Sequence, residues 1–278
     1  MRFPSGPLCL VANLGLGLAF VARPPLTHQA CTRHGALERG SCSTVMVEQI
    51  DKVPNVAAVL LAGGVGSRMK ADRPKQFLEL MGVPVLQYSL DLFRAIEGVD
   101  RIILVLDEQY RDRFYELKQQ EPRLVFADPG KERQDSVYNA LQHVQEGASV
   151  VCIHDTARPL VTPECVYRVL ADGYKHEAAV LGVPMKATVK ESDDGEFVQR
   201  TIDRSRLWEI QTPQVIRPSL LREGFERVKS QGWEVTDDVS IIEQMGHPVK
   251  LTLGEYTNLK VTTPDDMVVA AQIIKSAS

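Results

Sequence analysis

Closely spaced glycines followed by two cations mark the segment from Leu61 to Gln76. It reads Leu-Ala-Gly-Gly-Val-Gly-Ser-Arg-Met over 61–69, and Lys75 lies seven residues past Arg68. Glycines let backbone N–H groups approach phosphate oxygens, and they permit positive φ angles. Arg68 and Lys75 can add full positive charges to a polyphosphate site. The segment therefore predicts a phosphate-binding loop.

Two common phosphate-binding motifs do not fit this loop. A Walker A loop needs Gly-Lys-Ser/Thr after the glycines, and none follows. A dinucleotide fingerprint needs a third glycine, but Met69 stands there after Gly64 and Gly66. The next strand-end acid, Asp107, lies roughly twice as far away as such a fold requires. The structural alternative is a tight strand-to-helix turn with solvated charges.

A carboxylate ends another apolar run. Asp155 follows Val151-Cys152-Ile153-His154. Magnesium keeps several waters and needs only one or two carboxylates plus phosphate oxygens, so Asp155 is the candidate metal ligand. We interpret His154 as a hydrogen-bonded packing residue, and Arg158 either as a phosphate ligand or as an ion-pair partner.

The segment 130–137 predicts a helix start. It reads Gly-Lys-Glu-Arg-Gln-Asp-Ser-Val. Helix N-termini favour anionic ligands, and Ser136 can hydrogen-bond a nucleotide. A solvated, charged first turn is the alternative for this segment taken alone.

The predicted elements bring these segments together. Apolar runs rich in valine and isoleucine predict buried strands at 56–61, 101–106, 124–127, 149–153 and 178–183. Amphipathic stretches predict helices at 86–96, 109–119, 133–144 and 163–174. This alternation predicts an α/β fold, with a Rossmann-like, mostly parallel sheet flanked by helices. Ligands bind at the carboxyl ends of such strands, which here end at Gly63, Asp107, Asp128, Asp155 and Pro184.

One segment, at about 186–207, breaks the alternation. Two alternating strands around an Asp-Gly turn predict a β-hairpin arm. An isolated hairpin is marginally stable, so we expect the arm to pack on a second subunit in a homodimer.

Composition argues against several classes of function, and the N-terminal region indicates targeting. A net charge of −4 does not favour a nucleic-acid or anionic-membrane surface, and no Cys-x-x-Cys pair suggests a zinc or redox site. Residues 1–47 contain four arginines, one acid and no lysine, and an uncharged apolar stretch runs from Leu8 to Ala22. This predicts a bipartite plastid-targeting leader over 1–52, ahead of a catalytic domain at 53–278. A disordered tail is the alternative for the leader.

The motifs carry a family resemblance. The pattern L-A-G-G-x-G-S-R-M-x4-P-K-Q resembles the signature of sugar-phosphate nucleotidyltransferases, and its ending narrows this to enzymes acting on methylerythritol phosphate or ribitol phosphate. From about Val56 to Ala271, the chain resembles the 2-C-methyl-D-erythritol 4-phosphate cytidylyltransferase family, particularly its plant and algal members. The further motifs are Asp203-Arg204, Gln211-Thr212-Pro213-Gln214, Thr236-Asp237-Asp238 and Asn258-Leu259-Lys260-Val261-Thr262.

The resemblance implies roles for single residues. Arg68 and Lys75 match residues that stabilise the transition state, and Asp155 matches the ligand of Mg²⁺ or another divalent cation. The implied nucleotide contacts are Ala62, Gly63, Gly64, Gly66, Gly130, Ser136 and Thr156. The implied contacts to the second substrate are Arg158, Thr188, Arg204, Thr212 and Lys260. Thr156 and Lys131 depart from the residues common in bacterial members.

The implied reaction needs no protein nucleophile. The phosphate of methylerythritol phosphate attacks the α-phosphorus of CTP and expels pyrophosphate, in the non-mevalonate route to isoprenoid precursors. One alternative is a ribitol 5-phosphate cytidylyltransferase. A second is a CTP-binding scaffold without activity. In such a protein we expect the charged motif residues to be replaced by others, but all four positions keep residues suited to catalysis: Arg68, Lys75, Asp155 and Lys260.

Overall fold

The computed structural model describes residues 52–64, 69 and 73–277. Residues 1–51 of the predicted leader, Gly66 and Arg68 lie outside the described residues. Among the helices within them, none has the length and apolar character needed to cross a membrane.

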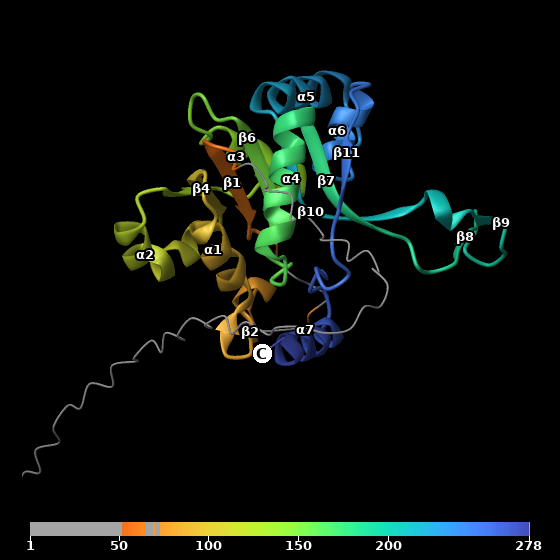
Figure 1. Ribbon diagram of the computed structural model, residues 1–278, viewed down its shortest axis with the longest axis horizontal. Coiled ribbons are helices and arrows are strands. Elements are labelled where there is room, and N and C mark those ends of the chain that lie inside the picture. The colour runs from red at the N-terminus through yellow and green to blue at the C-terminus, as the bar shows by residue number, and fades with distance from the viewer. Residues whose placement is uncertain (1–51, 65–68, 70–72, 278) are drawn as a thin grey trace, which may run out of the picture. The chain divides into compact units, whose positions relative to one another are not determined.

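A seven-stranded sheet forms the centre of the domain (Figure 1). The strand order is β11-β7-β10-β6-β1-β4-β5. All neighbouring strands run parallel except β10, which is antiparallel to both β6 and β7. The mostly parallel α/β sheet predicted from the sequence is confirmed. The strands are β1 (Val56–Leu61), β4 (Val99–Val105), β5 (Leu124–Ala127), β6 (Val150–Asp155), β7 (Ala178–Pro184), β10 (Trp208–Ile216) and β11 (Lys250–Leu253).

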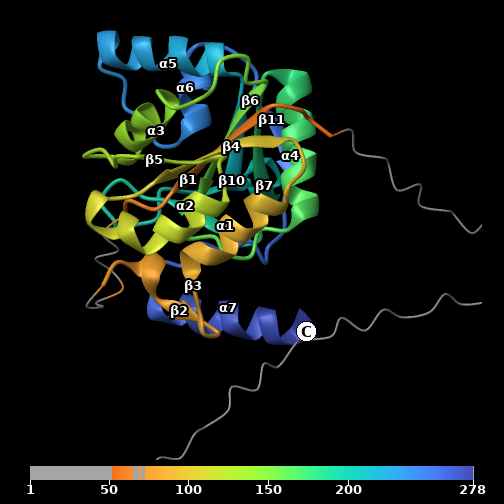
Figure 2. The same cartoon turned by 90° about the vertical axis from the view of Figure 1, so that its left-hand side faces the viewer.

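Helices cover both faces of the sheet (Figure 2). Side chains alternate along a strand, so Ala58 and Leu60 of β1 enter one core while Ala57 and Val59 enter the other. The first core is covered by α1 (Val85–Ala95) and α4 (Pro163–His176). The second is covered by α3 (Arg133–Leu141), α5 (Pro218–Gln231) and α6 (Asp238–Gln244).

Most predicted elements appear within a few residues of their expected bounds. Thr162 caps α4 as predicted, accepting a hydrogen bond from the Cys165 backbone N–H at 3.4 Å. The helix predicted at 109–119 differs, because it begins as a 3-10 helix, η3 (Glu108–Phe114), and continues as α2 (Tyr115–Gln120). Asp107 caps this element, accepting a hydrogen bond from the Gln109 backbone N–H at 3.1 Å, and lines neither of the cavities described below.

A small third core joins the C-terminal helix to the glycine-loop side of the domain. It contains buried side chains of Met69, Leu80, Val85, Val261 and Ala270. Ala270 lies on α7 (Pro264–Ala277), and Leu80 lies on β2 (Glu79–Leu80), which pairs with β3 (Val83–Pro84). This packing brings residues 254–263, which form neither helix nor strand, back to the strand ends of the sheet.

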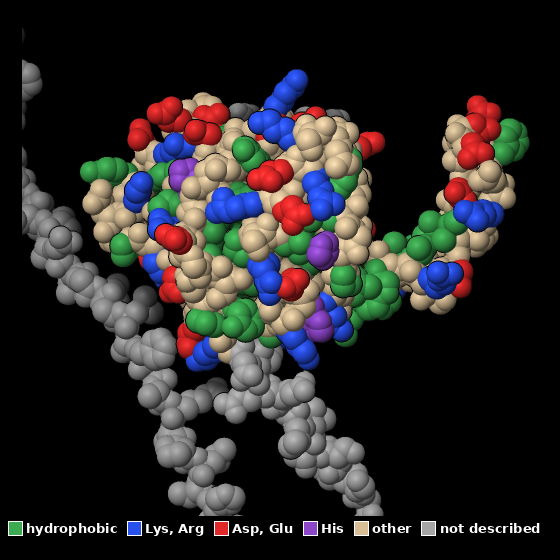
Figure 3. Space-filling model, turned by 90° about the horizontal axis from the view of Figure 1, so that it is seen from above, with side chains coloured by type: hydrophobic (Ala, Val, Ile, Leu, Met, Phe, Trp, Pro, Cys, Tyr) green, Lys and Arg blue, Asp and Glu red, His purple; other side chains and the backbone are tan. Residues whose placement is uncertain are grey.

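The predicted hairpin is present as an arm that projects from the sheet (Figures 1 and 3). Its strands are β8 (Val189–Glu191) and β9 (Arg200–Ile202), paired antiparallel. Gly195 in the turn has φ +76°, a conformation that favours glycine. Phe197, near the turn, is 75 % exposed, so the arm leaves a large apolar side chain without cover from its own chain.

Candidate active site

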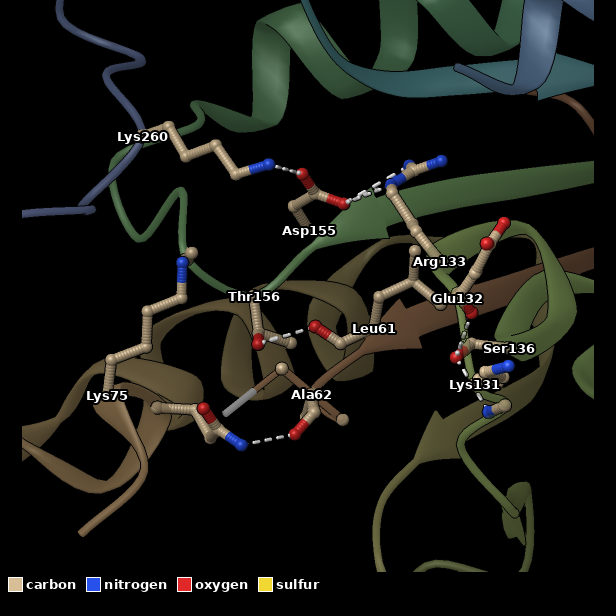
Figure 4. Close-up of a pocket in the computed structure, with 15 residues that line it drawn as sticks. Leu61, Ala62, Lys75, Lys131, Glu132, Arg133, Ser136, Asp155, Thr156 and Lys260 are labelled. Atoms are coloured by element: carbon tan, nitrogen blue, oxygen red, sulfur yellow. Dashed lines mark hydrogen bonds and ion pairs between the residues drawn. The ribbon is translucent and has the colours of Figure 1, made fainter. Parts of the chain in front are cut away.

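A cavity of about 310 Å³ opens at the carboxyl ends of β1 and β6 (Figure 4). Its walls combine the described part of the glycine loop, the start of α3 and the C-terminal loop. Lys75, Lys131, Arg133 and Lys260 supply four cations, against the carboxylates of Glu132 and Asp155. The cavity is therefore suited to a polyanionic ligand of nucleotide size.

Close packing explains two glycines of this cavity. A Cβ on Gly63 would lie 2.5 Å from Pro129 Cβ, and one on Gly130 would lie 2.8 Å from the Ser136 nitrogen. Among the residues that the structure describes, none lies within 4 Å of a Cβ placed on Gly64. None of the three has a positive φ. Gly63 and Gly130 are therefore required for close approach, whereas Gly64 leaves room for a ligand.

Asp155 occupies the centre of the charged lining (Figure 4). Lys260 Nζ donates to its Oδ2 at 2.5 Å, and Arg133 Nη2 lies 3.1 Å from its Oδ1. Burial by itself would raise the pKa of this carboxyl, but the two neighbouring cations outweigh burial and hold the pKa well below its usual range. Asp155 is therefore an anion at neutral pH.

Arg133 is a site residue that the sequence analysis did not single out. Its Nη1 and Nη2 donate to Oδ1 and Oδ2 of Asp238, each at 2.8 Å. Asp238 is only 1 % exposed. Arg133 thereby links α3, β6 and α6. The only sequence signal was its place in the charged segment 130–137, since its partners lie 22 and 105 residues away.

A second cavity, of about 380 Å³, shares a wall with the first. The shared residues are Arg133, Asp155 and Lys260. The second cavity adds side chains from β10 and from the segment before α6, including Gln211, Thr212, Gln214 and Asp237. Two ligands bound in the two cavities would meet at Asp155, with a lysine and an arginine beside them.

Thr212, which lines the second cavity, is fixed beside Asp155 by two hydrogen bonds. Its Oγ1 accepts from the Asp155 backbone N–H at 3.1 Å and lies 3.1 Å from His154 Nδ1. His154 Nε2 lies 3.2 Å from the Arg158 carbonyl oxygen. Burial lowers the pKa of His154 to about 4, so the ring is neutral at pH 7. The interpretation of His154 as a buried, hydrogen-bonded packing residue is confirmed.

Arg158 contacts backbone rather than a carboxylate. Its guanidinium donates to the carbonyl oxygens of Asn258, at 2.7 Å, and of Ile210, at 3.3 Å. Arg158 also lines the second cavity. It holds two chain segments together at the place where the sequence analysis expected a substrate contact.

Two predicted nucleotide contacts also use their hydroxyls inside the protein. Thr156 Oγ1 donates to the Leu61 carbonyl at 2.8 Å, and Ser136 Oγ donates to the Glu132 carbonyl at 3.1 Å. Both residues line the first cavity. A ligand there would meet hydroxyls that already donate and can still accept.

The structure brings Ala62, Gly63, Gly64, Lys75, Gly130, Ser136, Thr156, Asp155 and Lys260 to the first cavity. Lys75 Nζ donates to the Val261 carbonyl at 3.2 Å. Thr188 and Arg204 lie on or beside the arm and line neither cavity of their own chain. Arg204 donates to the Lys186 carbonyl at 2.5 Å, which ties the two sides of the arm near its base.

The donor set at Asp155 suits one kind of metal site. Within the residues that the structure describes, no three His, Cys, Asp or Glu side chains gather in a metal-binding cluster. This does not suit zinc in an all-protein site, which takes three or four such ligands. Magnesium bound mainly by phosphate oxygens and water needs only one or two carboxylates, and Asp155 borders both cavities.

Comparisons with known proteins point to one family. Residues 56–276 match the family model of 2-C-methyl-D-erythritol 4-phosphate cytidylyltransferase (IspD). The chain is 53 % identical to the chloroplastic 2-C-methyl-D-erythritol 4-phosphate cytidylyltransferase of Oryza sativa subsp. japonica, covering 80 % of this chain and 75 % of that protein. It is 42 % identical to the cytidylyltransferase of the same name from Geobacillus thermodenitrificans, covering 80 % and 98 %.

Solved structures agree with these sequence relatives. The 4-diphosphocytidyl-2C-methyl-D-erythritol synthase of Anaerococcus prevotii superposes with a TM-score of 0.72 at 27 % identity, covering 80 % of this chain and 96 % of the other. The 2-C-methyl-D-erythritol 4-phosphate cytidylyltransferase of Thermus thermophilus superposes with a TM-score of 0.65 at 31 % identity, covering 79 % and 98 %. The family resemblance seen in the sequence motifs is therefore confirmed.

Proposed function

Because the chain belongs to the 2-C-methyl-D-erythritol 4-phosphate cytidylyltransferase family, we propose that it transfers CMP from CTP to 2-C-methyl-D-erythritol 4-phosphate. The products are 4-diphosphocytidyl-2-C-methyl-D-erythritol and pyrophosphate. The observation that carries this proposal is the wall of Arg133, Asp155 and Lys260 shared by two adjoining cavities. A reaction between two phosphate-bearing substrates needs such a boundary.

The first cavity is the proposed CTP site. Backbone N–H groups of the glycine loop would receive the phosphates, and Gly64 supports this because no described residue would block a ligand that approaches it closely. The start of α3, with Gly130 and Ser136, would lie near the cytosine. Lys75 and Arg68 are the proposed groups that stabilise charge on the transferred and leaving phosphates, although Arg68 lies outside the described residues.

The second cavity is the proposed acceptor site. Lys260, Thr212 and Arg158 line it and would hold methylerythritol phosphate there. An oxygen of the acceptor phosphate forms a bond to the α-phosphorus of CTP while the bond from that phosphorus to the β-phosphate bridging oxygen breaks. The bond electrons leave with pyrophosphate. Positioning and charge stabilisation suffice for this step, so it needs no protein nucleophile.

A divalent cation, Mg²⁺ by preference, is part of the proposal. Asp155 would hold it, and the cation would neutralise charge that develops on the phosphate oxygens. Lys260 and Arg133 contact the same carboxylate. We expect both to adjust when the cation binds, and Arg133 also has Asp238 as a partner.

The arm supports a homodimer. Thr188 and Arg204 are predicted substrate contacts, yet they line neither cavity of their own chain. The arm also exposes Phe197 and Val198, at 75 % and 60 %. We propose that each arm packs on a partner subunit and brings Arg204 and Thr188 to the partner's acceptor site.

Plastid localisation is the proposed setting. The rice relative is chloroplastic, and the N-terminal 52 residues have the composition of a targeting leader. Fusing residues 1–52 to a fluorescent protein in algal or plant cells would test this. Plastid fluorescence supports the proposal, and cytosolic fluorescence would contradict it.

A pyrophosphate-release assay tests the function itself. The purified protein would be given CTP and Mg²⁺ with methylerythritol phosphate in one series and ribitol 5-phosphate in another. We expect a much larger kcat/KM with methylerythritol phosphate, and product release that stops when EDTA removes the metal. Preference for ribitol 5-phosphate would establish the related activity instead. CTP binding without turnover of either acceptor would favour the scaffold alternative.

A further inference from the structure

The segment 254–263 carries Lys260 but has no regular secondary structure to hold it. The Lys260 side chain is 38 % exposed, and its ammonium group contacts Asp155. A long, partly exposed lysine side chain has many rotamers, so one ion pair does not determine where it lies. The backbone of the segment must therefore be fixed by other residues.

Asn258, two residues before Lys260, makes the contacts that can do this. It is fully buried, at 0 % exposure. Its Nδ2 donates to Thr212 O at 3.0 Å and to Gln211 Oε1 at 3.1 Å, both on β10. Arg158 donates to the Asn258 carbonyl at 2.7 Å. Both amide hydrogens of the side chain are therefore donated to β10, the strand that lines the acceptor-side cavity.

Gln211 connects β10 to the same segment by further hydrogen bonds. Its Nε2 donates to the Glu255 carbonyl at 2.9 Å, while its Oε1 accepts from Asn258. A Cβ on Gly254 would lie 2.5 Å from Gln211 Oε1, so the segment passes very close to β10. Hydrogen bonds between one buried amide and two groups of β10 therefore hold the segment against the sheet near its middle.

We propose that Asn258 is a positioning residue for the acceptor side of the reaction. Its amide ties the segment that carries Lys260 to β10 at Thr212, so that Lys260 and Thr212 keep their places in one cavity. Asn258 itself lines neither cavity. This inference rests on the proposed function, because it assigns Lys260 and Thr212 to the acceptor.

Variants of Asn258 that remove its amide donor test the proposal. Asn258→Asp has nearly the same shape but places a carboxylate oxygen against the Thr212 carbonyl, and an amide donor is lost. Asn258→Ser removes the amide without adding charge, and its short hydroxyl can serve one partner at most. Asn55→Asp is the matched control, because Asn55 Nδ2 donates to the Gly147 carbonyl at 2.6 Å, beside the opposite end of β1.

The experiment measures acceptor kinetics and CTP binding on the full chain. For each variant, kcat and KM for methylerythritol phosphate are determined at saturating CTP, and the Kd for CTP is measured by calorimetry. Melting temperatures show that each variant is folded at the assay temperature. If Asn258→Asp does not fold, Asn258→Ser carries the same comparison.

The proposal predicts a selective loss. Residues that orient metal ligands by hydrogen bonds typically lower affinity or activity by about 10–100-fold when they are mutated. We expect a loss of similar size here, so that kcat/KM for the acceptor falls by that factor while the Kd for CTP stays within about threefold of wild type. Asn55→Asp should match wild type in both. An unchanged acceptor kcat/KM, or an equal loss of CTP binding, would overturn the proposal. A wild-type protein that makes no product would refute the proposed function instead.

Discussion

Arg133 binds the Asp238 carboxylate through both of its terminal nitrogens, at 2.8 Å each, and also reaches Asp155. The neighbouring carboxylates outweigh the effect of burial and raise the pKa of Arg133, so the guanidinium is permanently charged. The Arg133 guanidinium thus pairs with two carboxylates, that of the buried Asp238 on α6 and that of Asp155 in the site. We expect the contact with Asp238 to contribute mainly to stability and the contact with Asp155 mainly to activity.

We therefore expect Arg133→Gln to destabilise the protein and inactivate it. Breaking a buried ion pair from one side typically costs about 3–5 kcal/mol, because the remaining charge is left without a partner. Adding Asp238→Asn removes that charge and should restore most of the free energy of unfolding, measured with urea. Activity should stay low in the double variant, because Arg133 lines both cavities. A double variant as unstable as Arg133→Gln would contradict this account.

Lys75→Ala should leave the fold intact and remove catalysis. Losing one preorganised charge at a phosphoryl-transfer site typically lowers turnover by about 10²–10³. Stopped or continuous pyrophosphate assays would measure kcat at saturating substrates. Lys118→Ala is the control, since Lys118 lies on α2 and lines neither cavity. Near-normal turnover by Lys75→Ala would remove Lys75 from the mechanism.

Much of the fold could be predicted from local sequence. Strands buried on both faces are continuous apolar runs, so β1 and β5 have the predicted bounds. The antiparallel strand β10 was not predicted, because Gln211, Pro213 and Gln214 interrupt its apolar pattern. Its register with β7 shifts between Ile210 and Gln214. Both glutamines are buried, and their side-chain amides are satisfied by hydrogen bonds. Proline at an irregularity in a strand is compatible with this shift.

The residues of the candidate site also fall into those that the sequence predicts and those that it does not. Lys75, Asp155 and Lys260 belong to motifs with recognisable residue types, and the structure brings all three to one cavity. Arg133 and Asn258 act through partners on distant segments, so their roles depend on topology. Asn258 belongs to a motif noted in the sequence, but that motif does not show that its side chain is buried and donates twice to β10.

Acid should destabilise the protein partly through Glu121. Hydrogen bonds from Arg123, at 2.8 Å to each carboxylate oxygen, lower the pKa of Glu121 from 4.5 to about 2. A pKa lowered by folding contributes stability above about pH 4.5 that is lost as the pH falls toward 2. Glu121→Gln should therefore lower the melting temperature at neutral pH and flatten its decline in acid. Glu116→Gln, at an exposed position of α2, should leave both unchanged.

The arm predicts catalysis across two subunits. If Arg204 acts in the partner's acceptor site, Arg204→Ala on one chain and Lys75→Ala on the other both damage the same site of a mixed dimer. One site then receives an intact Lys75 from its own chain and an intact Arg204 from the other. Random exchange makes half of the dimers mixed, with one intact site of two, so two inactive variants should together recover roughly a quarter of wild-type activity in a closed two-fold dimer.

The mixing experiment needs one control and has a clear contrary result. The two variants are unfolded together, refolded and assayed for pyrophosphate release, beside each variant refolded alone. Different affinity tags on the two variants, with both tags recovered in one pull-down after refolding, control for subunit exchange. If the two single variants recover nothing although the pull-down shows that exchange has occurred, Arg204 acts within its own subunit, and the arm does not complete the partner's site.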